Sequence, residues 1–293
     1  MFAGGAGVHA VSIAKLTPRI NRVDTRSLNF MGLAYNTISR LQSRRVVNAA
    51  SDVHTPVSMT TNKQMQMVMR DMLFITWAVE PEVLRKLVDQ RLELDTKSDS
   101  NGRMVAFVSA VCFHITDLRS RALPLPSLAF QQVNYRVYVR AREVPAVCFL
   151  GMKVNSRMVT TLTSFMSVPV YYEDIDITTS PGSDGSLRYS VKSAGLRAEA
   201  MIGQDDVETE LEGKIWSQFI THRLVGYVGA GNGMFRIDVE QPGLDAVSAR
   251  VQSVQAPILE QLGLLTPDQS AQPYSALYVR EGLFAADTPV REW

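Results

Sequence analysis

The stretch Val133-Asn134-Tyr135-Arg136-Val137-Tyr138-Val139-Arg140 alternates between two kinds of side chain. Successive side chains of a β-strand point to opposite faces, so this alternation predicts a strand with two chemically different faces. The apolar face consists of Val133, Tyr135, Val137 and Val139. The polar face consists of Asn134, Arg136, Tyr138 and Arg140.

Strand and helix signals continue on both sides of this segment. Upstream, residues 72–79 are rich in strand formers, Pro81 opens a helix, and the turn signal Asn101-Gly102 separates residues 92–94 from a long apolar strand over 104–115, which predicts a hairpin. Downstream, we expect strands over 146–153, 171–178, 187–191, 196–202, 234–240 and 275–282, and helices over 156–166, 206–221 and 257–262. Many antiparallel strands interrupted by a few helices predict an α+β fold, and a closed or nearly closed barrel leaves few strand edges unpaired.

The composition is that of an ordinary globular protein. The chain has 293 residues, of which 46% are hydrophobic and 20% charged, and a formal net charge of +1, so no charge excess favours nucleic acid. The longest nearly uncharged apolar stretch, 104–115, is well short of the roughly 20 residues of a membrane-spanning helix. We therefore expect a soluble protein with no nucleic-acid or membrane partner, and a homo-oligomer stays compatible with the sequence.

Cysteine usage points to a reducing compartment. Cys112 and Cys148 both lie in apolar, strand-like runs and lack CxxC spacing. This pattern predicts two buried thiols, neither a disulfide nor a zinc site, and a cytoplasmic protein.

Residues 1–57 differ from the remainder of the chain in composition and charge. They open with a glycine-rich run, carry seven basic residues against Asp24 and Asp52, and develop no sustained apolar period. We interpret them as a basic leader or arm, with an organellar transit peptide as the alternative. The methionines at 59, 65 and 67 leave open that the natural product begins there, and one barrel domain is expected over residues 58–293.

Three segments together resemble a known family. They are residues 74–84 followed by Leu92-Glu93-Leu94-Asp95, then residues 130–139, then Phe219-Ile220-Thr221-His222-Arg223-Leu224. The middle segment resembles an F-x-E-x-N-x-R-x-Y-V strand and the last an F-L-T-x-R-Y segment, as in the YqjF-like family of uncharacterised proteins (domain of unknown function 2071). The resemblance runs roughly from residue 69 to 288. It implies the fold of acetoacetate decarboxylase, a mostly antiparallel, cone-shaped β-barrel with flanking helices and a ligand cavity.

Two departures argue against decarboxylase chemistry. The decarboxylase branch carries a G-x-P-K-K motif with a Schiff-base lysine, whereas the comparable stretch here, Ser167-Val168-Pro169-Val170-Tyr171, has no lysine. Lys153, the nearest lysine in sequence, precedes the predicted helix instead of following it. Gln132 stands where the family strand usually has glutamate, which weakens acid–base chemistry there. Acetoacetate decarboxylase activity is therefore not expected.

The polar strand face is the best candidate site. Gln132, Asn134, Arg136 and Tyr138 could line a cavity in which Arg136 holds a carboxylate, the alternative being an ordinary solvated strand face. A weaker catalytic candidate is Tyr172 with Asp174, which share a strand face with Asp176, although paired carboxylates on a strand are more often exposed.

The histidines, the glycine-rich segment and the methionines give weaker functional evidence. His114 reads as a core histidine and His222 as a cation near a helix end, and neither has a partner at metal-ligand spacing. The glycine-rich residues 226–233 lack the lysine of a phosphate-binding loop, and no motif implies a cofactor or a metal. Met65, Met67, Met69 and Met72 read as core or start-site methionines.

Three functions remain open from the sequence. The first is a binding protein for a small apolar or carboxylate-bearing metabolite, anchored by Arg136, Asn134 and Tyr138. The second is a lyase or hydratase-type enzyme that uses Tyr172 or Asp174 as acid–base groups around the same cavity. The third is a structural or interaction protein with a filled barrel.

Overall fold

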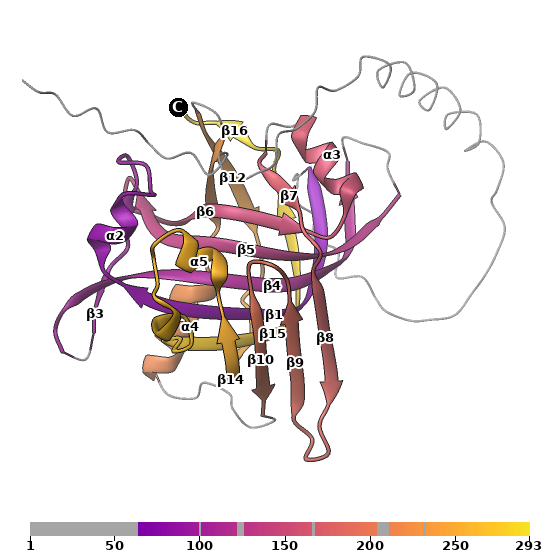
Figure 1. The fold of residues 1–293 in the computed structure, drawn as a ribbon. Helices are drawn as coiled ribbons and strands as arrows, with labels where there is room; N and C mark the ends of the chain where they lie inside the picture. The colour runs from indigo at the N-terminus through magenta and orange to yellow at the C-terminus, as the bar shows by residue number, and fades with distance from the viewer. Residues whose placement is uncertain (1–63, 100, 122–125, 166–167, 204–210, 231–232) are drawn as a thin grey trace, which may run out of the picture. The chain divides into compact units, whose positions relative to one another are not determined.

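The described part of the chain folds into two β-sheets accompanied by a few short helices (Figure 1). The structure is a computed structural model that describes residues 64–99, 101–121, 126–165, 168–203, 211–230 and 233–293. The expected leader, residues 1–57, lies outside this range. The expected α+β fold of mostly antiparallel strands and few helices is confirmed for the described part.

The large sheet contains twelve strands. Its long strands are β1 (Met65–Val79), β4 (Met104–Ser120), β5 (Leu128–Ala141), β6 (Val144–Val154), β11 (Val225–Ala230), β12 (Gly233–Glu240) and β15 (Ser275–Ala286). Its short strands are β2 (Glu93–Leu94), β3 (Lys97–Ser98), β7 (Val170–Tyr172), β13 (Ala246–Ser248) and β16 (Val290–Arg291).

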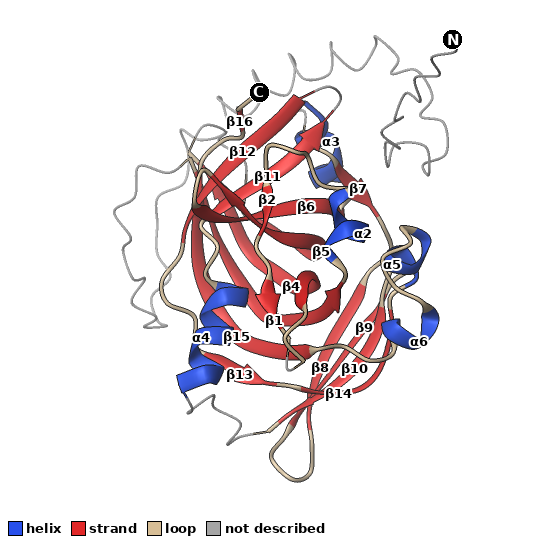
Figure 2. Cartoon of the chain, turned by 90° about the vertical axis from the view of Figure 1, so that its left-hand side faces the viewer, coloured by secondary structure: helices blue, strands red, loops and turns tan. Residues whose placement is uncertain are grey.

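The strand order of this sheet is β13-β15-β1-β4-β5-β6-β11-β12-β16. Neighbours are antiparallel except β6 with β11 and β6 with β7. Two further residue pairs, Val239 with Ala286 and Glu240 with Ala285, join β12 to β15. The strand path therefore returns to β15, and Figure 2 shows its long strands curving accordingly.

The small sheet has four antiparallel strands in the order β14-β10-β9-β8. They are β8 (Asp176–Pro181), β9 (Leu187–Lys192), β10 (Arg197–Ile202) and β14 (Arg250–Gln255). One side chain ties this sheet to β5, because the Gln131 amide donates to the carbonyl of Ile177 and accepts from its N–H, both at 3.1 Å. An amide side chain thus pairs with the backbone as a neighbouring strand would.

The helices are α2 (Pro81–Arg85), α3 (Arg157–Phe165), α4 (Leu211–Thr221), α5 (Pro257–Gln261) and α6 (Pro267–Ser270). Four of them match the helical segments expected after Pro81 and over 156–166, 206–221 and 257–262. Within the described part of the chain, no helix is long and apolar enough to cross a membrane.

The expected hairpin between residues 92–94 and the long apolar strand is wrong in its pairing. Glu93 and Leu94 pair with Arg140 and Val139 of β5, and β3 pairs with β4 instead. The turn at Gly102 therefore joins β3 to β4, while the carbonyl of Tyr138 accepts a hydrogen bond from Asp95 N at 3.0 Å. The apolar residues around Leu92 and Leu94 serve the core beside β5 instead of a local hairpin.

Each face of β5 packs against a hydrophobic core, so neither its apolar nor its polar face is simply open to solvent. The apolar face of β5 lies in one core together with the buried face of the small sheet, including Tyr189, Val191 and Ala198. The opposite face belongs to a second core that contains Tyr138, Phe107 and residues of α4. The polar face of β5 is therefore not an ordinary solvated strand face, since Tyr138 is fully buried and Gln132, Asn134 and Arg136 are half-buried.

Strand β1 changes the parity of its inward residues at Asp71. This residue has φ of 51°, in the left-handed region, and the pairing of β1 with β4 shifts register between Arg70 and Leu73. An extra residue in one strand moves the following side chains to the other face. As a result, Met69 and Met72, three residues apart, both face the second core.

Candidate functional site

A cavity of about 250 Å³ lies on the polar face of β5, and we call it the β5 cavity. Its wall combines side chains of the large sheet with α3 and the segment after α4. Most of the wall is apolar, including five methionines and five phenylalanines: Met65, Met67, Met69, Met72, Met152, Phe74, Phe113, Phe130, Phe149 and Phe284. Methionine adapts its shape to an irregular apolar partner, so this wall suits a small apolar group.

The polar lining of the β5 cavity is sparse and cationic. It consists of Gln132, Asn134, Arg136, Thr163, Thr221, Arg223 and Gln241. Among the described lining residues there are two arginines and no aspartate, glutamate, histidine or lysine. The sequence-predicted residues Gln132, Asn134 and Arg136 thus meet at one cavity.

Arg136 is the cation of the predicted site, which also comprises Gln132, Asn134 and Tyr138. Its Nη2 donates to the carbonyl of Ile220 at 2.7 Å and to the Tyr138 hydroxyl at 3.4 Å, and its Nε is buried without a partner. The guanidinium also lies over the Phe74 ring at 5.1 Å. No carboxylate of the described residues pairs with it, so Arg136 brings an uncompensated charge to an apolar wall.

Arg223, in contrast, is paired. Its Nη1 donates to Asp95 Oδ2 at 2.7 Å and its Nε donates to the carbonyl of Phe219 at 2.8 Å. Burial lowers the pKa of its guanidinium, and the bond to Asp95 opposes that shift. Because Asp95 compensates Arg223, the two arginines leave one net positive charge at the cavity.

Three side chains that line the cavity donate hydrogen bonds to carbonyl groups at the carboxyl end of α4. Arg136, Arg223 and Gln241 bind the carbonyls of Ile220, Phe219 and Thr221 respectively. The last carbonyls of a helix have no partner within the helix, and cations are favoured there. Both arginines therefore have a structural role in capping α4 in addition to facing the cavity.

Tyr138 lies behind the cavity and is not part of its lining. Its hydroxyl bonds to Ser109 Oγ at 2.8 Å, and Ser109 Oγ bonds to Thr76 Oγ1 at 2.7 Å. All three side chains are fully buried. This hydroxyl chain across β1, β4 and β5 holds the Tyr138 hydroxyl, which in turn accepts from Arg136, so Tyr138 orients the anchor and does not itself reach the cavity.

Gln132 and Asn134 form an amide pair. Gln132 Nε2 donates to Asn134 Oδ1 at 2.6 Å. Both residues line the β5 cavity, and neither is among the buried side chains whose polar atoms lack partners. The hydrogen bond between them therefore fixes the orientation of both amides beside the cavity.

Tyr172 and Asp174 are not brought to this cavity. The Tyr172 hydroxyl donates to Asp174 Oδ1 at 2.5 Å, and the bond to Asp174 raises the pKa of Tyr172. Both side chains line a separate surface depression with Asp176 and Lys192, and the Arg157 guanidinium lies over the Tyr172 ring at 4.1 Å. The arrangement is a local surface contact, and Arg136 does not line this depression.

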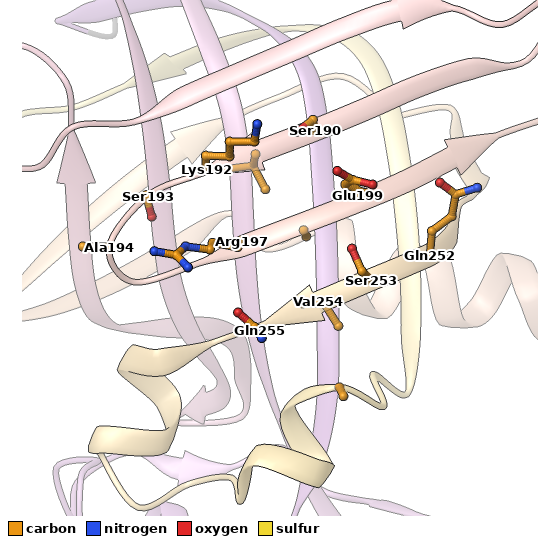
Figure 3. Close-up of a pocket in the computed structure, with 13 residues that line it drawn as sticks. Ser190, Lys192, Ser193, Ala194, Arg197, Glu199, Gln252, Ser253, Val254 and Gln255 are labelled. Carbon is orange, nitrogen blue, oxygen red and sulfur yellow. The ribbon is translucent and has the colours of Figure 1, made fainter.

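A larger, open depression of about 930 Å³ lies on the outer face of the small sheet, and we call it the outer groove. Figure 3 shows Lys192, Arg197 and Glu199 on its floor, with Gln252 and Ser253 from β14 beside them. These five side chains are exposed. Exposed charges are well hydrated and contribute little to binding, so the outer groove is the weaker site.

Sequence patterns alone do not identify several residues of the site. No motif gives Asp95 or Arg223 a role, and Met65, Met67, Met69 and Met72, expected in the core or at a start site, line the β5 cavity. The three segments of the family resemblance do signal the site, because Asp95, Arg136 and Arg223 come from one segment each and converge there. Cys112 and Cys148 are buried free thiols, and the described residues contain no group of three or more potential metal ligands.

The comparisons with known proteins agree with this architecture. Residues 66–280 match the model of the DUF2071 family, described as an uncharacterized conserved protein. The chain belongs to this family. It is also 35% identical over 114 residues to the uncharacterized protein YqjF of Bacillus subtilis (strain 168), a match that covers 38% of this chain and 45% of that protein.

The fold of this DUF2071 chain is similar to that of acetoacetate decarboxylase-like proteins. The enduracididine biosynthesis enzyme MppR, complexed with the condensation product of pyruvate and imidazole 4-carboxaldehyde, aligns with a TM-score of 0.53 at 11% identity, over 84% of this chain and 98% of that one. Acetoacetate decarboxylase from Legionella pneumophila subsp. pneumophila str. Philadelphia 1 aligns with a TM-score of 0.52 at 13% identity, over 85% and 98%. At these identities the similarity establishes the fold and leaves the chemistry to the site.

Proposed function

We propose that this chain binds a small apolar metabolite that carries a carboxylate, with the carboxylate held by Arg136 in the β5 cavity. The observation that carries the proposal is a half-buried guanidinium at an apolar wall with no carboxylate partner among the described residues. A charge removed from water is costly unless it is paired, and a carboxylate bound to arginine gives a strong, charge-assisted contact.

The dimensions of the cavity support a small ligand. Pockets for drug-sized ligands measure roughly 300–1,000 Å³, and the β5 cavity, at about 250 Å³, lies just below that range. The methionine and phenylalanine wall favours an apolar body on the ligand. The fold neighbour MppR, whose structure contains a pyruvate-derived product, supports the proposal by analogy of fold only.

The proposal does not include Schiff-base chemistry. The described lining of the β5 cavity offers no lysine amine. Lys153 lies in register with Val133, on the opposite face of the sheet, where its Nζ is 3.9 Å from Glu173. Nor does an acid–base role of Tyr172 and Asp174 gain support, since both lie at another depression. The buried thiols Cys112 and Cys148 are in keeping with a cytoplasmic setting for this binding role.

Calorimetric titration of the full chain tests this proposal. The probes are butanoate, hexanoate and phenylacetate, with hexanamide as the uncharged counterpart of hexanoate. We expect at least one acid to bind and hexanamide to bind at least tenfold more weakly. An acid present at a hundred times its Kd should also stabilise the fold by about 2.7 kcal/mol.

A matched pair of variants locates the anchor. Arg136→Gln should lose the acid, whereas Arg197→Gln, the same change in the outer groove, should keep it. Circular dichroism checks that Arg136→Gln still folds, because Arg136 also caps α4. Acid binding that survives in Arg136→Gln but not in Arg197→Gln would move the site to the outer groove, and no acid binding at all would favour an interaction protein.

A further inference from the structure

We infer that Gln132 and Asn134 form a neutral polar subsite beside Arg136, which selects monocarboxylates carrying a carbonyl or hydroxyl oxygen on the carbon next to the carboxylate. The inference rests on the proposed function and specifies its ligand. Two observations support it: the net charge of the cavity, and the polar atoms of the Gln132–Asn134 amide pair that have no hydrogen-bond partner among the described residues.

The charge of the cavity selects one carboxylate. Arg223 is compensated by Asp95 at 2.7 Å, and Arg136 has no acidic partner in the described part of the chain. The described lining adds no further charge, positive or negative. One anionic group therefore balances the site, whereas a second carboxylate would face a methionine and phenylalanine wall without a counter-ion, which is costly.

The amide pair leaves one donor and one acceptor for a ligand. The bond from Gln132 Nε2 to Asn134 Oδ1 fixes the orientation of both amides. Asn134 Nδ2 and Gln132 Oε1 are then unused, and neither atom is among the buried side-chain atoms that lack a partner. Both atoms are therefore not fully buried, and they belong to residues that line the cavity, so Nδ2 can donate to a ligand carbonyl and Oε1 can accept from a ligand hydroxyl.

The positions of these groups on β5 set the spacing of the ligand oxygens. Asn134 and Arg136 are successive residues on one strand face, about 6.6 Å apart along the strand. When the carboxylate binds Arg136, the substituent on the next carbon comes within reach of the Asn134 amide. A site built to hydrogen-bond an oxygen rejects the analogue that lacks it, because the polar groups of the site then lose water without gaining a partner.

The test compares four ligands on the full chain by isothermal titration calorimetry at pH 7: hexanoate, 2-oxohexanoate, 2-hydroxyhexanoate and hexanedioate. We expect the 2-oxo or the 2-hydroxy acid to bind at least tenfold tighter than hexanoate. Hexanedioate should bind at least tenfold more weakly than hexanoate. Asn134→Ala should bring the oxo acid to within about threefold of hexanoate, because the amide that distinguishes the two acids is gone.

Two further variants keep the test informative. Gln132→Glu preserves the shape of the side chain but adds a carboxylate beside Arg136, so it should weaken all four acids at least tenfold even if Asn134→Ala misfolds. Gln252→Ala removes an amide from the outer groove and should leave every Kd unchanged. Equal binding of hexanoate and both substituted acids by the unaltered chain, with Gln132→Glu neutral, would overturn the subsite and leave the proposed function standing. Failure of every acid to bind would overturn both.

Discussion

Arg223 Nη1 lies 2.7 Å from Asp95 Oδ2 and so joins two segments that are 128 residues apart in the chain. Asp95 follows β2, beside the central strand β5, and Arg223 follows α4. The pair fixes the carboxyl end of α4 against the large sheet. It also neutralises one of the two cavity arginines, so one contact serves both the packing and the charge of the site.

Asp95→Asn should destabilise the fold strongly. The Arg223 side chain is only 3% exposed and that of Asp95 14%, so the change leaves a buried guanidinium without its counter-ion. Breaking a buried ion pair in this way costs about 3–5 kcal/mol. Urea denaturation measures the loss, and Glu281→Gln is the control, because the Arg70–Glu281 pair is more than half exposed and should cost less than about 1 kcal/mol. Equal losses for the two variants would contradict the structural role of the Asp95–Arg223 pair.

Gly195→Ala should destabilise the fold because of one neighbouring hydroxyl. A Cβ at Gly195 would lie 2.6 Å from the hydroxyl oxygen of Tyr135, a residue that is fully buried. Forcing an extra methyl group into a packed core costs about 1–3 kcal/mol. Tyr135→Phe removes the clashing oxygen, so the double variant should be more stable than Gly195→Ala alone.

Gly229→Ala is the control for this pair, because a Cβ there meets nothing within 4 Å. Its effect on the urea midpoint should be small and unchanged by Tyr135→Phe. If Tyr135→Phe failed to rescue Gly195→Ala, the contact between the residue 195 side chain and the Tyr135 hydroxyl would not be the cause of the loss.

Stability should fall steeply at alkaline pH. Burial raises the pKa of the hydroxyl groups of Tyr135, Tyr189 and Tyr278, and it raises the pKa of the Cys148 thiol to about 12. Groups whose pKa is raised in the folded state keep protons that the unfolded chain releases. Their contribution is complete below about pH 8.5 for the thiol and about pH 10 for the phenols, and it is lost as the pH rises above these values.

Tyr189→Phe tests the alkaline behaviour. The free energy of unfolding should fall by about 1.4 kcal/mol per pH unit for each such tyrosine above pH 10, so removing one phenol should reduce the slope by about that amount. Urea titrations from pH 8 to pH 11 measure the slope. An unchanged slope in Tyr189→Phe would mean that this phenol titrates alike in the folded and unfolded chain.

The alternation in β5 was sufficient to predict the strand and its polar face, but not what covers that face. Gln132, Asn134 and Arg136 could have faced water or a cavity with the same sequence pattern. The answer depends on α4, whose Ile220 carbonyl binds Arg136, and on α3, whose Val159 and Thr163 line the same cavity. Strand periodicity specifies which residues share a face, whereas burial of that face depends on distant segments.

The β1 side chains that line the β5 cavity show a second limit of prediction from strand periodicity. A strict two-residue period places Met69 and Met72 on opposite faces, yet the left-handed residue Asp71 brings both to the β5 cavity. The Tyr278 hydroxyl donates to Asp71 Oδ1 at 2.6 Å, from a strand 207 residues away. A bulge supported by so distant a partner leaves no local signal in the sequence.

The hydroxyl groups of Thr76, Ser109 and Tyr138 form a chain behind Arg136. Ser109→Ala removes the central link, so the Thr76 and Tyr138 hydroxyls, both fully buried, each lose their partner in that chain. A buried polar group left unsatisfied costs about 1–3 kcal/mol, more than the net value of an ordinary hydrogen bond. Thr76→Val on the Ser109→Ala background removes the Thr76 hydroxyl, which Ser109→Ala leaves without its partner in the chain, so the double variant should lose less stability than the sum of the single changes. Urea denaturation of the two single variants and the double variant measures this coupling. Simple additivity would mean that the Thr76 and Ser109 hydroxyls contribute to stability independently of each other.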